Sequence, residues 1–118
     1  MRHEVTDDDT AAAVGSGDVP MLATPRLIAW LEAATVRAAA PCIGVGQTTV
    51  GTAVRIEHRR ATPVGGSVDV VAEVQHHVGR RLTFAVQAVD GSGTVVAAGE
   101  IHRVVVDRDR FLGKEVVV

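Results

Sequence analysis

Residues 23–41 carry the one long apolar pattern in the chain that has the period of a helix. Apolar side chains recur every three to four positions there; they are Leu27, Leu31, Ala34 and Ala38. Because an α-helix has about 3.6 residues per turn, this spacing places them on one face. The pattern therefore predicts a single long helix with one buried face.

Thr24 and Pro25 mark where this helix should begin. A threonine hydroxyl just before the first turn accepts a hydrogen bond from a free backbone N–H. Proline at the first helical position loses no hydrogen bond, because that N–H has no partner within the helix. We therefore expect Thr24 to act as the N-cap of the helix.

The rest of the chain has the patterns of strands joined by turns. A short strand at residues 3–6 precedes the helix, and four apolar runs follow it, at residues 48–58, 68–77, 82–88 and 94–106. One helix with several consecutive strands is typical of an α+β domain. We expect the helix to lie against a curled antiparallel sheet of about five strands.

Parity assigns the side chains of residues 48–58 to two faces of a strand. One face would carry Val50, Thr52, Val54, Ile56 and, with the same parity, His58. Arg55 and Glu57 would point away. His58 is therefore expected on the apolar side of the sheet.

Several strand segments are apolar on both faces, namely residues 70–71, 95–98 and 104–106. A strand with one wet side should alternate between apolar and polar residues. One helix covers only one side of the sheet, so the other side needs a second cover. We infer that two copies of the chain form a homodimer.

Composition limits the class of protein. The 118 residues suit one domain, residues 1–118, with 47% hydrophobic residues, 22% charged residues and a net charge of −2. These values favour neither disorder nor the basic surface of a nucleic-acid-binding protein. No apolar run reaches the roughly 20 residues that cross a membrane, and the start of the chain is polar. We expect a cytoplasmic protein that binds neither membranes nor nucleic acid.

Cysteine and histidine do not suggest a metal site or another cofactor. Cys42 is the only cysteine and is expected to pack in the interior. His76 and His77 are neighbours in a strand, so their side chains should point to opposite faces and cannot chelate one ion.

Glu32 is a candidate for chemistry because of its place on the helix. At about 100° per residue it falls on the flank between Ile28 and Val36, far from the arginines at positions 26 and 37. No residue of the helix offers it a positive partner. A carboxylate desolvated beside apolar side chains can act as a nucleophile or a base.

The sequence resembles the hot-dog-fold thioesterases, and within them the fluoroacetyl-CoA thioesterase family. The resemblance covers nearly the whole chain and is carried by ATPRLIAWLEAATVRAAAP, VGTAVRIEHRRATPVGGSV and VGRRLTFAVQAVDGSGTVVAAGEIHRVVV. It implies that Thr24, Glu32 and His58 are catalytic, and that the backbone N–H of Gly51 faces the thioester carbonyl oxygen. It also implies a site at the subunit interface. The family's named member has phenylalanines in a lid before the helix, whereas residues 15–22 of this chain contain no aromatic residue.

The resemblance implies an acyl-CoA thioesterase that releases a carboxylic acid and free coenzyme A without a cofactor. Glu32 would be nucleophile or base, Thr24 would orient it, and His58 would supply or relay a proton. Other interpretations of single residues remain open: Glu32 as a solvated surface residue, His58 as a core histidine, and Gly51 as the mark of a bulge or bend in a curled strand. The whole chain could also be a non-catalytic protein that binds acyl-CoA or a protein partner. A hydratase on the same fold would carry an Asp and His a few residues apart after its helix, and no such pair follows Pro41.

Overall fold

A computed structural model describes residues 1–113 of the chain. Its elements follow the order β1 (Arg2–Glu4), η1 (Asp7–Asp9), α1 (Ala11–Val14), α2 (Thr24–Ala39), η2 (Ala40–Cys42), β2 (Gln47–His58), β3 (Ser67–Val78), β4 (Arg81–Asp90), β5 (Val95–Asp107) and α3 (Arg108–Phe111). Helix α2 has 16 residues and is the longest helix in the described part of the chain.

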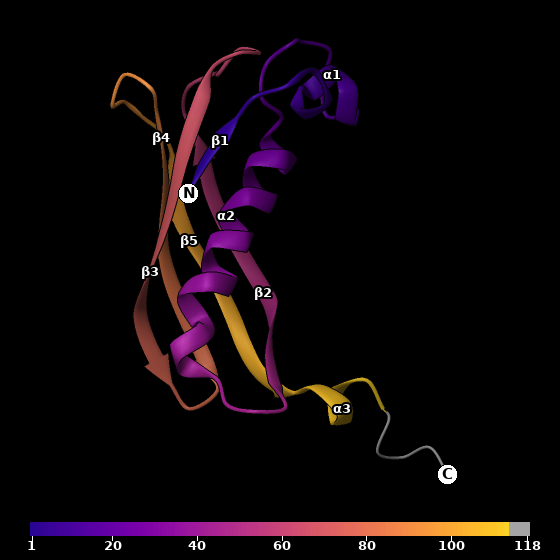
Figure 1. Cartoon of the computed structure of the whole chain (residues 1–118), viewed down its shortest axis with the longest axis vertical. Helices are drawn as coiled ribbons and strands as arrows, with labels where there is room; N and C mark the ends of the chain where they lie inside the picture. Colours follow the sequence, from indigo (N-terminus) through magenta and orange to yellow (C-terminus); the bar gives the residue numbers. More distant parts are fainter. Residues whose placement is uncertain (114–118) are drawn as a thin grey trace.

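The five strands form one curled antiparallel sheet in the order β1-β3-β4-β5-β2. Helix α2 runs along the concave side of this sheet, with β3 on one flank and β2 on the other (Figure 1). The predicted α+β architecture, with one long helix and about five strands, is confirmed.

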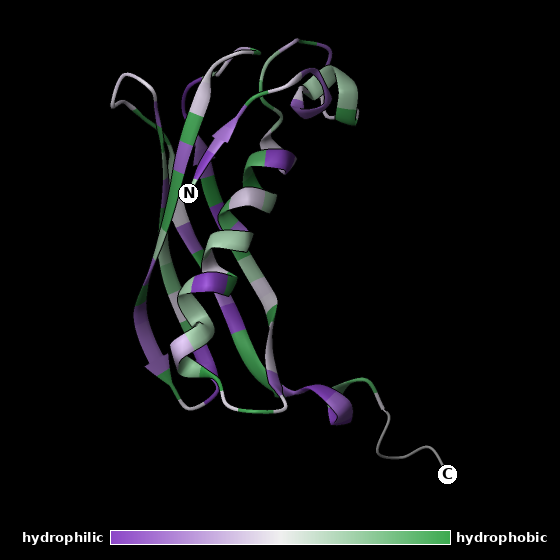
Figure 2. Ribbon diagram, viewed as in Figure 1, coloured by the Kyte–Doolittle hydropathy of each residue, from purple (hydrophilic) through white to green (hydrophobic). Residues whose placement is uncertain are grey.

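The core lies between α2 and the concave face of the sheet. Leu27 and Leu31 of α2 are fully buried, as are Phe84 of β4 and Ile101 of β5. Burying a side chain of this size contributes about 1.5–3 kcal/mol. Bands of apolar and polar residues alternate along the strands, as expected when one face of a sheet is covered (Figure 2).

The prediction that Thr24 caps α2 is wrong. Ala23 is the N-cap, because its carbonyl accepts the first helical hydrogen bond from Leu27 at 3.0 Å and its backbone is extended. The backbone carbonyl of Asp9 accepts the N–H of Ala23 at 2.8 Å, and the Asp9 carboxylate pairs with Arg26 at 3.2 Å. The start of α2 is thus satisfied from η1, and the Thr24 hydroxyl is not used for capping.

Strand β2 contains a bulge directly after Gly51, where the glycine had suggested one, and the parity argument did not take it into account. Gly51 lies opposite Arg103 of β5 and Ala53 lies opposite the next residue, His102, so Thr52 is the extra residue. The bulge reverses parity, and Val50 therefore does not share a face with Val54, Ile56 and His58. Gly51 and His58 are seven positions apart and would face opposite ways in a regular strand. With the bulge, both face α2.

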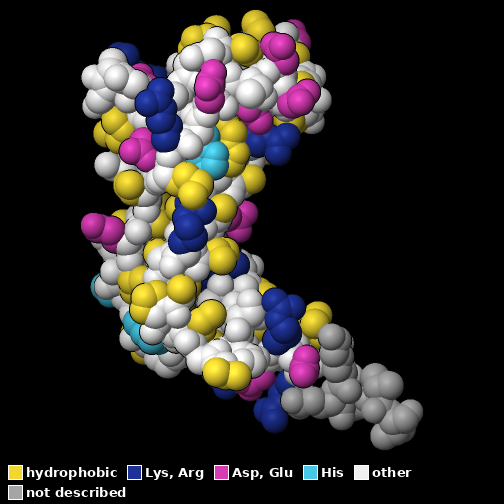
Figure 3. Space-filling view, in the orientation of Figure 1, with side chains coloured by type: hydrophobic (Ala, Val, Ile, Leu, Met, Phe, Trp, Pro, Cys, Tyr) yellow, Lys and Arg dark blue, Asp and Glu magenta, His cyan; other side chains and the backbone are white. Residues whose placement is uncertain are grey.

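Acidic side chains gather at one end of the molecule, over η1 and α1 (Figure 3). They include Asp7, Asp8 and Asp9, all within the single turn of η1. Of these, Asp9 is tied to Arg26. This end of the molecule also holds the first turn of α2.

The contact between β2 and β5 leaves no room for a side chain at Gly99. A β-carbon added there would overlap the carbonyl group of Arg55 on β2. We predict that Gly99→Ala lowers the free energy of unfolding by about 2 kcal/mol or more, because backbone would have to move. Urea denaturation of this variant and the native protein measures the loss.

Gly91→Ala is the matched control for this prediction. Its added β-carbon would meet only the Ser67 hydroxyl at 3.5 Å, which is ordinary contact. Equal losses in the two variants would contradict the tight β2–β5 contact.

Candidate active site

Thr24 and His58 meet where the first turn of α2 approaches the last residue of β2. The Thr24 Oγ1 and His58 Nδ1 atoms are 2.8 Å apart, which is a hydrogen bond. When the hydroxyl donates to Nδ1, the ring carries its proton on Nε2. A hydroxyl that donates to an imidazole is the arrangement in which a base activates a nucleophile.

The surroundings of His58 favour the neutral imidazole. Burial lowers the pKa of His58, and the backbone of Arg60 beside the ring opposes part of that decrease. The Nε2 atom is buried and has no hydrogen-bond partner among residues 1–113. A neutral ring with Nδ1 directed at a hydroxyl is ready to accept a proton.

The pair opens into a pocket of about 260 Å³. One wall comes from the lid segment, residues 15–22, through Ser16, Val19 and Met21. The lid is anchored next to the site, because the Leu22 N–H donates to the Thr62 carbonyl at 2.8 Å. As the sequence indicated, no aromatic side chain belongs to this wall.

Glu32 lies in a second cluster, with Gly51 of β2 and Arg103 of β5. Its Oε2 is 3.6 Å from Nη1 of Arg103. A β-carbon on Gly51 would come within 2.8 Å of the same oxygen, so only glycine lets the carboxylate lie this close to β2. The sequence offered Glu32 no positive partner within the helix. In the structure, Arg103 of β5 is its positive partner.

Arg103 is the site residue that sequence reasoning missed. Its side chain is 8% exposed, and it donates from Nε to Thr49 Oγ1 at 2.9 Å and from Nη2 to the Thr49 carbonyl at 3.1 Å. Burial lowers the pKa of Arg103, and the Glu32 carboxylate opposes this decrease. The signal available in the sequence was a single arginine within an apolar strand, with the parity of the buried Ile101.

The two clusters are separate within one chain. Thr24 and Glu32 are eight residues apart on α2, which is about 12 Å along the helix. Gly51 and His58 are seven residues apart on β2, and because one of these residues forms the bulge, they are about 20 Å apart along the strand. The structure therefore brings Thr24 to His58 and Glu32 to Gly51, but it does not bring all four together in one copy.

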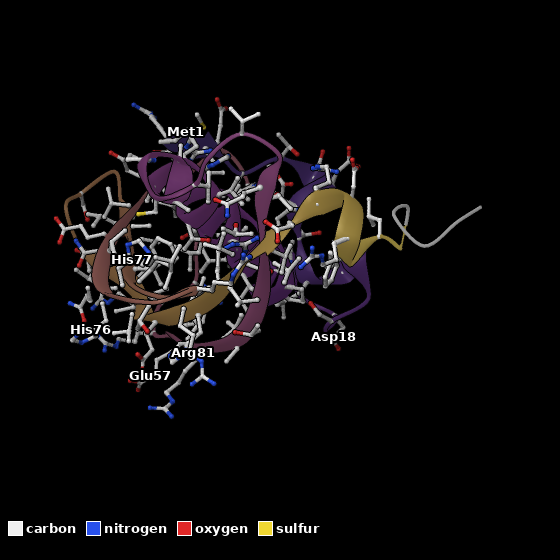
Figure 4. All side chains as sticks on the ribbon, turned by 90° about the horizontal axis from the view of Figure 1, so that it is seen from below. Met1, Asp18, Glu57, His76, His77 and Arg81 are labelled. Carbon is white, nitrogen blue, oxygen red and sulfur yellow. The ribbon has the colours of Figure 1, made fainter. Side chains whose placement is uncertain are left out.

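The opposite face of the sheet holds a larger hollow of about 610 Å³, around His76, Arg81 and His102. Figure 4 shows His76 and Arg81 on the outer side of the sheet, away from α2. None of the four predicted site residues lines this hollow.

In the described part of the chain, no three His, Cys, Asp or Glu side chains converge as a metal site would require. No helix formed by residues 1–113 is long and apolar enough to cross a membrane.

Comparisons with known proteins identify the family of the chain. The family model of the fluoroacetyl-CoA-specific thioesterase matches residues 5–109. The fluoroacetyl-CoA thioesterase of Streptantibioticus cattleyicolor is 37% identical over 94 residues, which are 80% of this chain and 67% of that protein.

Solved structures give the same result. A structure of the fluoroacetyl-CoA thioesterase FlK superposes with a TM-score of 0.87 at 31% identity, covering 98% of this chain and 89% of that one. A thioesterase superfamily member from Thermus thermophilus shares the fold, with a TM-score of 0.89 at 23% identity over 98% of this chain and 85% of that one. The chain has the hot-dog fold and is a thioester hydrolase that belongs to the fluoroacetyl-CoA-specific thioesterase family.

Proposed function

We propose that the protein hydrolyses an acyl-CoA thioester to a carboxylic acid and free coenzyme A. The hydrogen bond between Thr24 and His58 carries this proposal, because it couples a nucleophile to a base inside a pocket. A non-catalytic protein that only binds acyl-CoA would have no use for this arrangement.

The proposed reaction begins when Nδ1 of His58 takes the proton of the Thr24 hydroxyl. The Thr24 oxygen bonds to the thioester carbonyl carbon, and the carbon–sulfur bond then breaks. The histidine passes its proton to the departing thiolate, which leaves as free coenzyme A. Water then cleaves the acyl ester on Thr24, with His58 again accepting and returning a proton. The sequence had suggested that Thr24 orients Glu32. In this scheme Thr24 instead contacts His58 directly.

Glu32 and Gly51 would serve the same reaction from the other cluster. The Gly51 N–H would donate to the carbonyl oxygen as negative charge develops there, since no side chain blocks the approach. Glu32, held in place by Arg103, would orient the attacking water. Both roles require the second cluster to reach the Thr24–His58 pocket.

A homodimer would bring the two clusters together. Strand β2 is an edge strand of the sheet, and its residues 51–55 are exposed. An exposed edge presents unpaired N–H and C=O groups that can pair with another strand. Because Thr52 is an extra residue, antiparallel pairing of two β2 strands centred near Val54 would place His58 opposite Thr49 of the partner subunit. His58 would then lie on the same face as Gly51 of the partner subunit, two residues along the strand.

Such pairing would continue the sheet and keep its two faces distinct. Gly51 and His58 both face α2, so the partner's Gly51 would lie on the same side as the Thr24–His58 pocket. Two identical sites would result, each using Thr24 and His58 of one subunit and Glu32 and Gly51 of the other. This pairing leaves the outer face of the sheet uncovered, where Val71 and Val78 are 45% and 73% exposed, so it does not supply the second cover that the sequence led us to expect.

Removing the Thr24 hydroxyl should abolish most of the activity. We predict that Thr24→Val lowers kcat/KM by about a hundredfold or more, because valine has the same shape but no nucleophile or hydrogen bond. Thr24→Ser should retain most of the activity. Release of free thiol from a panel of acyl-CoA substrates measures both.

The same panel tests the acyl preference. Because the lid has no aromatic residue, the kcat/KM values for acetyl-CoA and fluoroacetyl-CoA should differ by less than about a hundredfold, or 2.7 kcal/mol.

A Thr24→Val protein as active as the native one would contradict the proposed nucleophile. Binding of acyl-CoA with no thiol release from any substrate would favour the non-catalytic alternative.

The pH dependence should report the neutral form of His58. Burial lowers the pKa of His58 below its ordinary value of 6.5, so the ring stays neutral to a lower pH than an exposed histidine. We predict that kcat/KM rises with pH and reaches half its plateau below pH 6.5. A half-maximum above pH 6.5 would contradict a desolvated base. His58→Gln should remove this acidic limb along with most of the activity.

A further inference from the structure

Two arginines follow the proposed base directly. Arg59 and Arg60 come after His58 at the end of β2, and both line the pocket that contains Thr24 and His58. Their backbone N–H groups donate to the same carbonyl, that of Val96, at 2.7 and 3.2 Å. The segment that carries them is therefore fixed to β5, although the side chains themselves are exposed.

Neither guanidinium is neutralised by a buried partner. Arg59 lies 3.5 Å from Glu57, but these side chains are 52% and 76% exposed, and such a surface pair contributes only about 0–1 kcal/mol. Arg60 forms no ion pair within 4 Å among the described residues. The pKa of Asp90 is lowered mainly by hydrogen bonds from Ser92 and Thr94, and the positive charge of Arg60 lowers it slightly further.

Arg59 and Arg60 are the charged residues that line this pocket. No Asp or Glu among residues 1–113 lines it. The nearby Asp9 carboxylate is already paired with Arg26. The N-terminal end of α2, which adds partial positive charge, also opens here through Thr24. Two arginines and a helix N-terminus without a lining carboxylate favour a negatively charged ligand group.

We propose that Arg59 and Arg60 form an anion subsite that holds a negative group of the acyl-CoA substrate. This inference rests on the proposed function and adds to it a specificity-determining pair. An arginine fork binds carboxylate and phosphate oxygens through two parallel hydrogen bonds. The anion is either a carboxylate at the far end of the acyl group or a phosphate of coenzyme A.

The test compares the double variant Arg59→Gln/Arg60→Gln with the native protein. Its matched control is Arg37→Gln/Arg81→Gln, which removes two exposed positive charges that do not line this pocket. Succinyl-CoA and butyryl-CoA have four-carbon acyl groups that differ in a terminal carboxylate. The butyryl thioester of N-acetylcysteamine has neither a carboxylate nor a phosphate.

We expect the double variant to lose about tenfold or more in kcat/KM for the anionic substrate, whereas the control keeps its native value. A loss with succinyl-CoA alone identifies the acyl carboxylate as the ligand. An equal loss with both CoA thioesters, and none with the N-acetylcysteamine thioester, identifies a CoA phosphate. Unchanged values with all three substrates, or an equal loss in the control, would overturn the anion subsite.

Calorimetry separates this inference from the proposed function. Binding of coenzyme A, butyryl-CoA and succinyl-CoA to native and variant proteins needs no turnover. If no thiol is released but the double variant binds the anionic ligand about tenfold more weakly, the proposed hydrolysis fails and the anion subsite stands. Equal affinities of native and variant proteins for all three ligands would overturn the subsite.

Discussion

The antiparallel pairing of β2 with β5, interrupted by one bulge, is the constraint on which the site depends. Without the extra residue at Thr52, Gly51 and His58 would lie on opposite faces of the sheet. With this extra residue, Gly51 and His58 both face α2. There Gly51 lies beside Glu32 and His58 contacts Thr24, at different turns of the helix. The absence of a side chain at Gly99 lets β2 and β5 approach closely enough to hold this register. A local irregularity in one strand thus decides which side chains can share a reaction.

The Glu32–Arg103 pair shows how the fold holds charge next to an apolar core. Burying a guanidinium without partners would cost several kcal/mol, and Thr49 offsets part of that cost through two hydrogen bonds. Glu32 completes the set from the helix, although its own side chain is 38% exposed. The carboxylate therefore keeps access to solvent while its position is held. We infer that this balance suits a group that must reach substrate or water.

The main elements could be predicted from the sequence because each has a strong local signal. The stripe containing Leu27 and Leu31 has helical spacing, and both residues are fully buried against the sheet. The strands alternate clearly, and glycine-rich turns separate them. Family resemblance indicated Thr24, Glu32, His58 and Gly51, and the structure places them in two pairs.

The remaining features depend on contacts between distant segments. The N-cap shifted to Ala23 because Asp9 of η1 satisfies the start of α2, and nothing near Thr24 in sequence indicates that contact. The bulge at Thr52 arises from the register with β5, which parity within one strand cannot show. Arg103 pairs with Glu32 across 71 positions of sequence, so the helix alone could not indicate the partner.

The central claim is that each active site is shared between two subunits, and mixed dimers test it most directly. We expect Thr24→Val and Glu32→Gln proteins each to be nearly inactive alone, because each lacks one functional group of the proposed site. The two proteins would be unfolded together and refolded as a random mixture. If the site is shared, half of the dimers are mixed, and each mixed dimer has one site with both native residues. The account therefore predicts recovery of about one quarter of native thiol release. If each site lies within one chain, no mixed dimer has an intact site, and activity that stays at the level of the separate variants would contradict the account.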